Sequence, residues 1–397
     1  MNSKKEVQHV YLVGAKSLGA YGGYETFVYK LTEYHQNKEN IKYHVACKAN
    51  GDGCMDESKF DGVTKINDHE FEFHNAHCFK IDVPQIGPAQ AIYYDVAALK
   101  ACCEHIKKNH IPHPIVYIMA CRIGPFASHF YREIHKLGGT VYLNPDGIDW
   151  QREKWQSGLG SKFIHQGEKN AAKYADEVIV LSKGVQKYFL ETYGRETHFI
   201  PNGVNRPEVR EARLIKDHFG LEKDSYILFL GRLVPEKGIR YLVEAFKNVK
   251  TDKKLVIAGG SSDTDSFMEE VKDLAKGDDR ILFTGFVQGA MLDELYSNAY
   301  IYTLPSDLEG MPLSLLEAMS YGNCCLVSDI PECAEVVEDK ALIFKKSDVE
   351  DLREKLQEAC DHPEMVMKMK KQAADFICAK YNWDEVVKET MKLYRRK

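Results

Sequence analysis

The chain of 397 residues lacks several features of membrane-spanning and secreted proteins. No apolar run approaches the roughly 18 residues that a membrane-spanning helix needs. The first residues, MNSKKEVQHVYLVGA, have neither the apolar core nor the cleavage site of a signal peptide. The 11 cysteines are odd in number, scattered and without a Cys-x-x-Cys spacing, which argues against a disulfide framework or a zinc site. We therefore expect a cytoplasmic protein with reduced thiols.

Two further absences concern charge and nucleotide motifs. The formal net charge is −6, whereas nucleic-acid-binding proteins are usually strongly basic, so we expect no nucleic-acid partner. The chain has no Gly-x-Gly-x-x-Gly fingerprint, and no Walker lysine follows its first glycine-rich stretch. An NAD-dependent oxidoreductase is therefore a weak alternative for its function.

Apolar runs typical of strands alternate with periodic runs typical of helices along the chain. A first set extends from VQHVYLVGA to HFIPNG and a second from SYILFLGRL to ALIF, separated by the polar segment NGVNRPEVREARL. Strands that are apolar on both faces and separated by helices predict parallel sheets covered on both sides. We expect an α/β protein with two Rossmann-like domains, residues 1–205 and 206–380, and a last helix, 381–397, that packs back on the first domain.

The stretch GAYGGYETF, residues 19–27, lies between the first expected strand and the first expected helix. In open α/β sheets, ligands bind beyond the carboxyl ends of the strands. Gly22 and Gly23 would allow the backbone to approach a ligand closely, and the helix N-terminus behind them suits a phosphate. A tight strand-to-helix turn without a ligand is the alternative.

The second domain begins with a comparable stretch, FLGRLVPEKG, residues 229–238. Arg232 and Lys237 follow the end of the expected strand at Gly231. Two cations there could hold a diphosphate, since Arg makes bidentate contacts and Lys supplies a point charge. Alternatively, both are solvated side chains on a surface loop.

A third stretch, SDLEGMPLSLLEAMSYG, residues 306–322, contains two glutamates eight residues apart. We expect Glu309 to begin a helix and Glu317 to lie about 12 Å further along its axis. The two carboxylates could then contact opposite ends of one elongated ligand. Gly310 would leave backbone N–H groups free for that ligand at the start of the helix. The alternative is that Glu309 only complements the helix dipole.

Together these three stretches resemble the retaining GT-B glycosyltransferases of family 4, over nearly the whole chain. The resemblance implies two Rossmann-like domains that face each other across a cleft, with a C-terminal helix crossing back to the first. Two first-domain stretches, VGAKSLGAYGGYETFV and LNPDGIDWQREKW, are similar to a subgroup that builds bacterial capsule and cell-wall polysaccharides. Several members of this subgroup are β-1,4 rhamnosyltransferases that use dTDP-L-rhamnose and a lipid-diphosphate-linked sugar acceptor.

The resemblance also implies roles for single residues. Gly22 and Gly23 would contact the donor or the incoming acceptor, and Arg232 and Lys237 would neutralise the leaving diphosphate, so that neither a metal ion nor a cofactor is needed. Glu309, with Gly310, would bind the donor sugar. Glu317 would accept a hydrogen bond from the nucleotide sugar. The lipid-linked acceptor implies peripheral binding to the inner face of the cell membrane.

The acceptor side is expected in the first domain. Asp146, in NPDG at a strand end, could bind an acceptor hydroxyl or act as a base, or it could simply form a turn. Asp149 and Arg152 are further acceptor-binding candidates. The nearby basic and aromatic residues are candidates for membrane contact: Arg152, Lys154, Trp155, Lys162 and Phe163.

Two other functions stay open beside the transferase. A GT-B nucleotide-sugar 2-epimerase would convert its substrate without an acceptor. A non-catalytic nucleotide-sugar-binding protein would bind without turnover. No spacing among the 15 histidines predicts a metal site, and His129, His135 and His165 are expected on helix faces.

Overall fold

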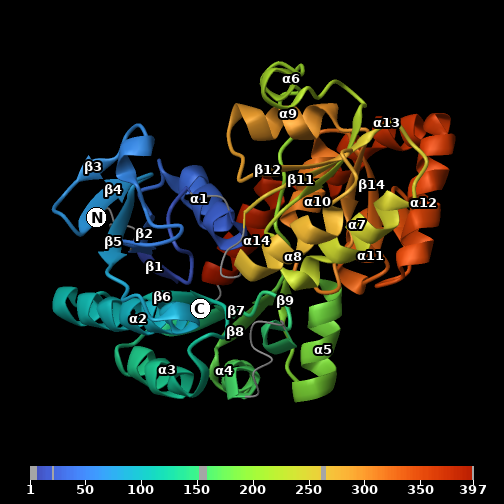
Figure 1. The fold of residues 1–397 in the computed structure, drawn as a ribbon. Coiled ribbons are helices and arrows are strands. Elements are labelled where there is room, and N and C mark those ends of the chain that lie inside the picture. Colours follow the sequence, from blue (N-terminus) through green and yellow to red (C-terminus); the bar gives the residue numbers. More distant parts are fainter. Residues whose placement is uncertain (1–6, 20–21, 152–158, 261–264, 396–397) are drawn as a thin grey trace. The chain divides into compact units, whose positions relative to one another are not determined.

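The computed structural model describes residues 7–19, 22–151, 159–260 and 265–395, which form two compact units (Figure 1). Unit 1 consists of Met1–Ile200 and Asp384–Lys397, and unit 2 consists of Pro201–Trp383. Each unit is built on a largely or wholly parallel sheet with helices between its strands. The predicted fold class, two Rossmann-like α/β domains, is confirmed.

The sheet of unit 1 has the strand order β3-β4-β5-β2-β1-β6-β7-β8-β9. Only the pairs β3–β4 and β4–β5 are antiparallel among those that the structure describes. Its central strands are buried on both faces, as the apolar runs predict; every residue of β6 is buried. The strands are β1 Gln8–Val13, β2 Ile41–Lys48, β3 Thr64–Lys65, β4 Glu70–Phe73, β5 Ala76–Ile81, β6 Ile115–Met119, β7 Thr140–Asn144, β8 Glu177–Val180 and β9 His198–Phe199.

Helices of unit 1 follow the strands and bury their apolar faces against the sheet. One core combines β1, β6 and β7 with α2, α3 and α5, and its largest fully buried side chains include Tyr11, Tyr131 and Phe189. The helices are α1 Gly23–His35, α2 Gln90–Asn109, α3 Ala127–Lys136, α4 Leu159–Tyr174 and α5 Lys183–Tyr193.

The terminal helix α14, Trp383–Tyr394, belongs to unit 1 from Asp384 onward. The hydroxyl of Tyr142, on β7, donates to the carbonyl oxygen of Leu393 at 2.8 Å. Leu393 and Tyr394 are both buried. The predicted return of the last helix to the first domain is therefore confirmed.

Unit 2 contains a fully parallel sheet in the order β12-β11-β10-β13-β14-β15. Its strands are β10 Tyr226–Leu230, β11 Lys254–Ala258, β12 Ile281–Gly285, β13 Ile301–Leu304, β14 Cys324–Ser328 and β15 Leu342–Phe344. The helices are α6 Leu214–Phe219, α7 Ile239–Lys247, α8 Asp265–Ala275, α9 Ala290–Asn298, α10 Leu313–Ser320, α11 Pro331–Val337, α12 Val349–Asp361 and α13 Pro363–Lys380. Throughout the described part of the chain, no helix combines the length and apolarity needed to span a membrane.

Candidate functional site

Two loops of unit 2 meet at one edge of its sheet. Strands β10 and β13 are parallel neighbours, so the loops that follow them start at the same edge. Gly238 ends the loop after β10 with φ +66°, and a Cβ atom there would lie 1.9 Å from the carbonyl oxygen of Pro305, which follows β13. Only glycine allows this approach, and it brings residues 231–238 beside residues 305–312.

A buried ion pair joins the two loops. The Lys237 ammonium, from the loop after β10, lies 2.6 Å from Oε1 of Glu309, from the loop after β13. The side chains are 13% and 8% exposed, so solvent screens the pair weakly. The structure thus brings together two residues that the sequence places 72 positions apart.

Two serines hold the Glu309 carboxylate in place. The hydroxyl of Ser306 donates to the same Oε1 at 2.5 Å, and the hydroxyl of Ser328 donates to the carbonyl oxygen of Ser306 at 2.5 Å. Both serines are fully buried. Sequence reasoning missed them, although each is followed by aspartate at the end of an apolar strand, as LPSD and LVSD show.

Arg232 and Oε2 of Glu309 are left for a ligand. Arg232 is exposed, and its side chain makes no ion pair or hydrogen bond with any residue that the structure describes. Within the same part of the chain, Oε2 of Glu309 has no hydrogen-bond partner, while Oε1 has two. The site therefore presents one uncommitted guanidinium, one paired ammonium and one acceptor oxygen. This set can bind an anion next to a hydroxyl-bearing group.

The expected helix from Glu309 onward is wrong. Helix α10 begins at Leu313, with Pro312 as its N-cap, so Glu309 and Gly310 lie in the preceding loop. The physical reason is that a proline disfavours the helical conformation of the residue before it, here Met311. The axial separation of about 12 Å expected for two helical glutamates does not apply.

Glu317 lies on α10 and is held by a different polar group. Its Oε2 accepts a hydrogen bond from the hydroxyl of Tyr296 at 3.1 Å. The Tyr296 ring stacks on that of Tyr321, with centroids 5.2 Å apart, and the Tyr321 hydroxyl donates to Asp293 at 2.7 Å. Tyr296 therefore holds Glu317, and Tyr321, the C-cap of α10, packs against Tyr296.

One further carboxyl group in this region was missed by sequence reasoning. Glu332 is the second residue of α11, which follows β14. Burial raises the pKa of Glu332, and the negative charge of Glu309 raises it further. The two carboxyl groups therefore lie close enough to influence each other, and Glu332 holds its proton to higher pH than an exposed glutamate does.

Unit 1 has a corresponding edge where β1, β6 and β7 end side by side. The guanidinium of Arg122, which follows β6, makes two hydrogen bonds to Asp95 of α2, at 2.8 and 3.2 Å, and a third to the carbonyl oxygen of Gly14 at 2.8 Å. Although burial alone lowers the pKa of Arg122, Asp95 outweighs it and the pKa is raised. Sequence reasoning missed this charged pair, which fixes the start of the loop after β1.

Gly22 and Gly23 are the N-cap and the first residue of α1. A Cβ atom on Gly22 would lie 2.1 Å from Oε2 of Glu25, whose Oε1 accepts a hydrogen bond from the backbone N–H of Lys16 at 2.7 Å. Gly22 thus makes room for a carboxylate in the first turn of the helix. That negative charge disfavours a phosphate at this N-terminus, so an uncharged hydroxyl is the better ligand for these glycines.

Asp146 and Asp149 follow β7 at this edge. Asp146 has φ +68°, and its backbone N–H donates to the side chain of Asn144 at 2.8 Å, so the turn expected from NPDG is present. The Asp146 side chain is half-buried, whereas Asp149 is buried. Asp149 also helps to raise the pKa of Arg122, which places it near the buried charged pair. Arg152, Lys154 and Trp155 lie outside the described residues.

Two groups of residues bear on the expectation that no metal is needed. Residues 263–265 read Asp-Thr-Asp, the Asp-x-Asp spacing that metal-dependent transferases use, which sequence reasoning overlooked. Asp263 lies outside the residues that the structure describes. In unit 1, three histidines with no motif spacing, His44, His77 and His105, come together in space.

Comparisons with known proteins divide the chain much as the structure does. Residues 7–205 match the family described as "Domain of unknown function (DUF1972)", and residues 211–376 match "Glycosyl transferases group 1". An uncharacterized glycosyltransferase of Methanocaldococcus jannaschii is 28% identical over 253 residues, which cover 59% of this chain and only 64% of that protein's length.

Two further comparisons cover a larger share of the compared protein. The N,N'-diacetylbacillosaminyl-diphospho-undecaprenol alpha-1,3-N-acetylgalactosaminyltransferase of Campylobacter jejuni is 28% identical over 266 residues, 60% of this chain and 69% of that protein. The crystal structure of Anabaena HepE with UDP and glucose superposes with a TM-score of 0.74 at 13% identity, covering 98% of this chain and 99% of the other. The latter likeness bears on the fold alone.

Proposed function

Because this chain belongs to the DUF1972 family and its residues 211–376 match the glycosyl transferases group 1 family, we propose that it transfers a sugar from a nucleoside-diphosphate sugar to an acceptor hydroxyl. The observation that carries the proposal is the buried Lys237–Glu309 pair with exposed Arg232 on the same loop as Lys237. A nucleoside-diphosphate sugar presents an anion next to a hydroxyl-bearing ring, which are the two ligands that this arrangement suits.

In this proposal the chemistry is charge stabilisation. The bond between the anomeric carbon and the diphosphate oxygen breaks while a bond to the acceptor oxygen forms on the same face, and the acceptor proton passes to the leaving phosphate. Arg232 and Lys237 stabilise the charge that develops on the diphosphate. Oε2 of Glu309 accepts a hydrogen bond from a sugar hydroxyl, backed by Gly310. Glu317 binds the nucleotide end of the donor.

For the donor and acceptor we propose dTDP-L-rhamnose and a lipid-diphosphate-linked sugar, joined by a β-1,4 linkage in bacterial surface polysaccharide synthesis. The support is the resemblance of residues 13–28 and 143–155 to rhamnosyltransferases. The C. jejuni relative, whose own acceptor is linked to diphospho-undecaprenol, adds support for a lipid-linked acceptor. Gly22, Gly23, Asp146, Asp149 and Arg152 would contact the acceptor.

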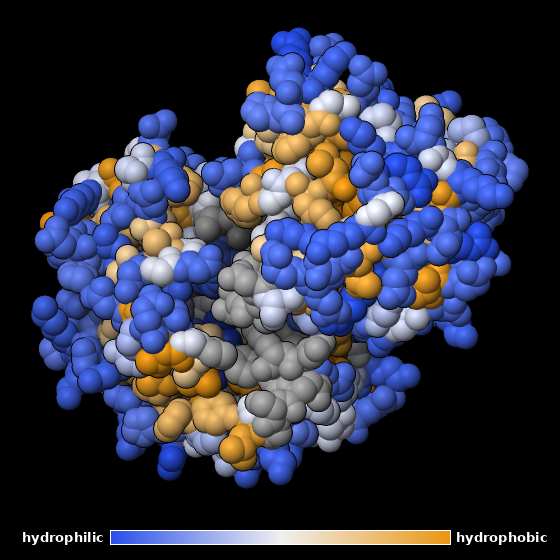
Figure 2. Space-filling model, in the orientation of Figure 1, coloured by the Kyte–Doolittle hydropathy of each residue, from blue (hydrophilic) through white to orange (hydrophobic). Residues whose placement is uncertain are grey.

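A lipid-linked acceptor requires the protein to reach a membrane surface. Phe126, the N-cap of α3, is 52% exposed, and Leu159, the first residue of α4, is 82% exposed. Figure 2 shows apolar side chains gathered on the part of unit 1 where Figure 1 places these helices. Lys162, also on α4, is exposed. Apolar side chains beside cations favour peripheral binding to anionic lipid, on the cytoplasmic face where nucleotide sugars are available.

The proposal is tested by incubating the purified protein with dTDP-L-rhamnose or a UDP-hexose, with and without a short-chain lipid-diphosphate sugar. Mass spectrometry should show an acceptor enlarged by one deoxyhexose only when both substrates are present. Conversion of the donor without acceptor would instead identify an epimerase. Nucleotide-sugar binding with no product from any acceptor would favour a non-catalytic binding protein.

A further inference from the structure

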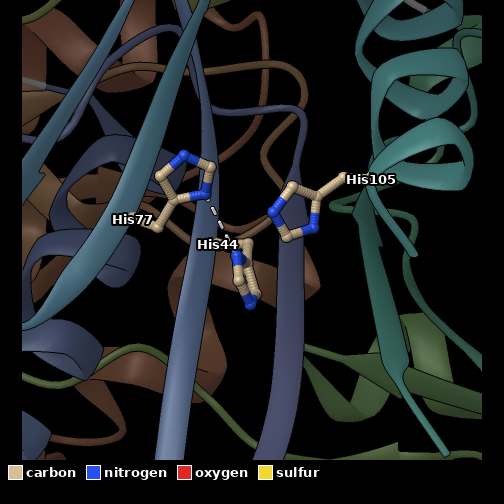
Figure 3. Close-up of side chains that lie close together, drawn as sticks. All are labelled: His44, His77 and His105. Atoms are coloured by element: carbon tan, nitrogen blue, oxygen red, sulfur yellow. Dashed lines mark hydrogen bonds between the residues drawn. The ribbon is translucent and has the colours of Figure 1, made fainter. Parts of the chain in front are cut away.

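A group of histidines lies within the sheet of unit 1, level with Tyr11 of β1. His44 on β2 and His77 on β5 are direct partners in the parallel register of these strands. His105 comes from α2, which covers this face of the sheet. Figure 3 shows the three imidazoles converging from two strands and one helix. His44 is the fourth of the eight residues of β2, and His77 is the second residue of β5.

The spacing of the ring nitrogens suits a tetrahedral metal ion. One ring nitrogen from each of His44, His77 and His105 lies within 4.8 Å of the others. Nδ1 of His44 and Nδ1 of His77 are 3.2 Å apart. Two nitrogens bound to zinc at about 2.0–2.1 Å in tetrahedral geometry are roughly 3.4 Å apart, so this pair is already near the required separation.

The remaining nitrogen of each ring has its own partner. Nε2 of His44 lies 2.9 Å from Nδ1 of His9, and Nε2 of His77 lies 3.5 Å from the Glu70 carboxylate. Nδ1 of His105 lies 2.8 Å from the Tyr11 hydroxyl. Metal-binding histidines generally donate their second N–H to such a group, which fixes the ring and selects the tautomer.

The charge around the group also permits a cation. Lys42 and Lys108 are the nearby lysines that oppose metal binding, and the Lys42 ammonium is paired with Glu72 at 2.8 Å. The Glu70 carboxylate adds negative charge on the other side of His77.

We propose that His44, His77 and His105 form a binding site for one divalent transition-metal ion, with zinc as the best-suited ion and water in the fourth position. Three neutral imidazoles favour zinc, copper or nickel over magnesium or calcium, which prefer oxygen ligands. The ion would tie β2 and β5 to α2 and so stabilise unit 1. This role is separate from the chemistry proposed at the end of the sheet of unit 2.

The test uses the full chain, stripped with a chelator and dialysed. Titration with zinc should give one ion per chain, and the melting temperature should rise with zinc. Cobalt should give the visible absorption bands of a tetrahedral nitrogen-ligated ion. The variant His77→Ala/His105→Ala should bind zinc more than about 100-fold more weakly. The matched control His129→Ala/His362→Ala removes two exposed histidines and should bind as the parent does.

A second variant, Glu70→Ala, keeps all three histidine ligands, so it tests the site even if the double variant does not fold. It should weaken zinc binding by about 10- to 100-fold through the loss of the partner of His77. Failure of the parent chain to bind zinc would overturn the proposal and leave a hydrogen-bonded histidine group. Equal zinc stoichiometry and affinity in the parent and the His77→Ala/His105→Ala variant would also overturn it, because the ion would then be bound elsewhere, for example by cysteine.

Discussion

The substitution Glu309→Gln separates the structural role of this side chain from its proposed role in binding the donor sugar. The glutamine can keep an acceptor oxygen for Ser306 and Lys237, but it removes the negative charge 2.6 Å from the Lys237 ammonium. Hydrogen bonds to charged groups contribute about 1.5–3 kcal/mol, so we expect a loss of roughly that size in the free energy of unfolding of unit 2. For a unit of its size this corresponds to about 2–4 °C in melting temperature per kcal/mol.

Turnover and nucleotide binding should respond differently to this substitution. Turnover should fall by about 100-fold or more, the scale for losing one positioned polar group that contacts the reacting sugar. Binding of the free nucleoside diphosphate should be unchanged or tighter, because Lys237 then carries an uncompensated positive charge. Turnover is followed by product mass spectrometry and nucleotide binding by calorimetry.

Glu294→Gln is a matched control. Glu294 is equally buried, at 5% exposure, and its carboxylate accepts backbone hydrogen bonds from Arg213 and Ile215 at 2.9 and 3.1 Å. Its substitution should lower stability without a selective loss of turnover. Near-normal turnover of folded Glu309→Gln, or an equal kinetic loss in Glu294→Gln, would refute the role of Glu309 in positioning the donor sugar.

Three other predictions concern metal, membrane and pH. If Arg232 and Lys237 neutralise the diphosphate as proposed, turnover should persist in EDTA. A complete loss of turnover that magnesium or manganese restores, together with the same loss in Asp263→Ala, would contradict this proposal. Restoration by zinc alone would point to the histidine group. Binding of the protein to anionic liposomes should weaken with added salt and in the variant Lys154→Glu/Lys162→Glu, whereas nucleotide binding should be unchanged. Equal flotation with neutral and anionic liposomes would disprove a contribution of charge to membrane binding. Burial lowers the pKa of His35 to about 4, from about 6.5 in the unfolded chain. The folded state therefore binds fewer protons, and the free energy of unfolding should fall as the pH drops from about 6.5 to 4, by up to roughly 1.4 kcal/mol per pH unit. Denaturant titration of His35→Gln should show a weaker dependence of this free energy on acid pH. The same pH dependence in the parent and the variant would show that His35 is not the group responsible.

The fold was predictable because the apolar runs and the periodic runs of the sequence both agree with it. The apolar runs are buried strands, the intervening periodic runs are helices, and the return of the last helix is supported by buried Leu393 and Tyr394. The start of α10 was misplaced because the helical period continues back to Glu309 although Pro312 prevents a helix there. Local sequence did predict the loop that carries Arg232 and Lys237, after the strand that ends near Gly231.

Contacts set by strand order were beyond the reach of the sequence. The pairing of Lys237 with Glu309 depends on β10 lying next to β13, and the support from Ser328 depends on β14 being the next strand. His44 and His77 are 33 residues apart and meet only because β2 and β5 pair in one particular register. No local spacing encodes such a register.

The assignment of Asp384–Lys397 to unit 1 has a consequence for how the protein is made. Unit 2 is contained within one continuous stretch, so all of its residues are synthesised before Asp384. Unit 1 is encoded in two pieces, and Tyr142 receives its partner, the carbonyl of Leu393, only after the whole of unit 2 has been synthesised. The part made first is therefore finished last, and a chain that stops before Asp384 has a complete unit 2 but exposes apolar surface of unit 1.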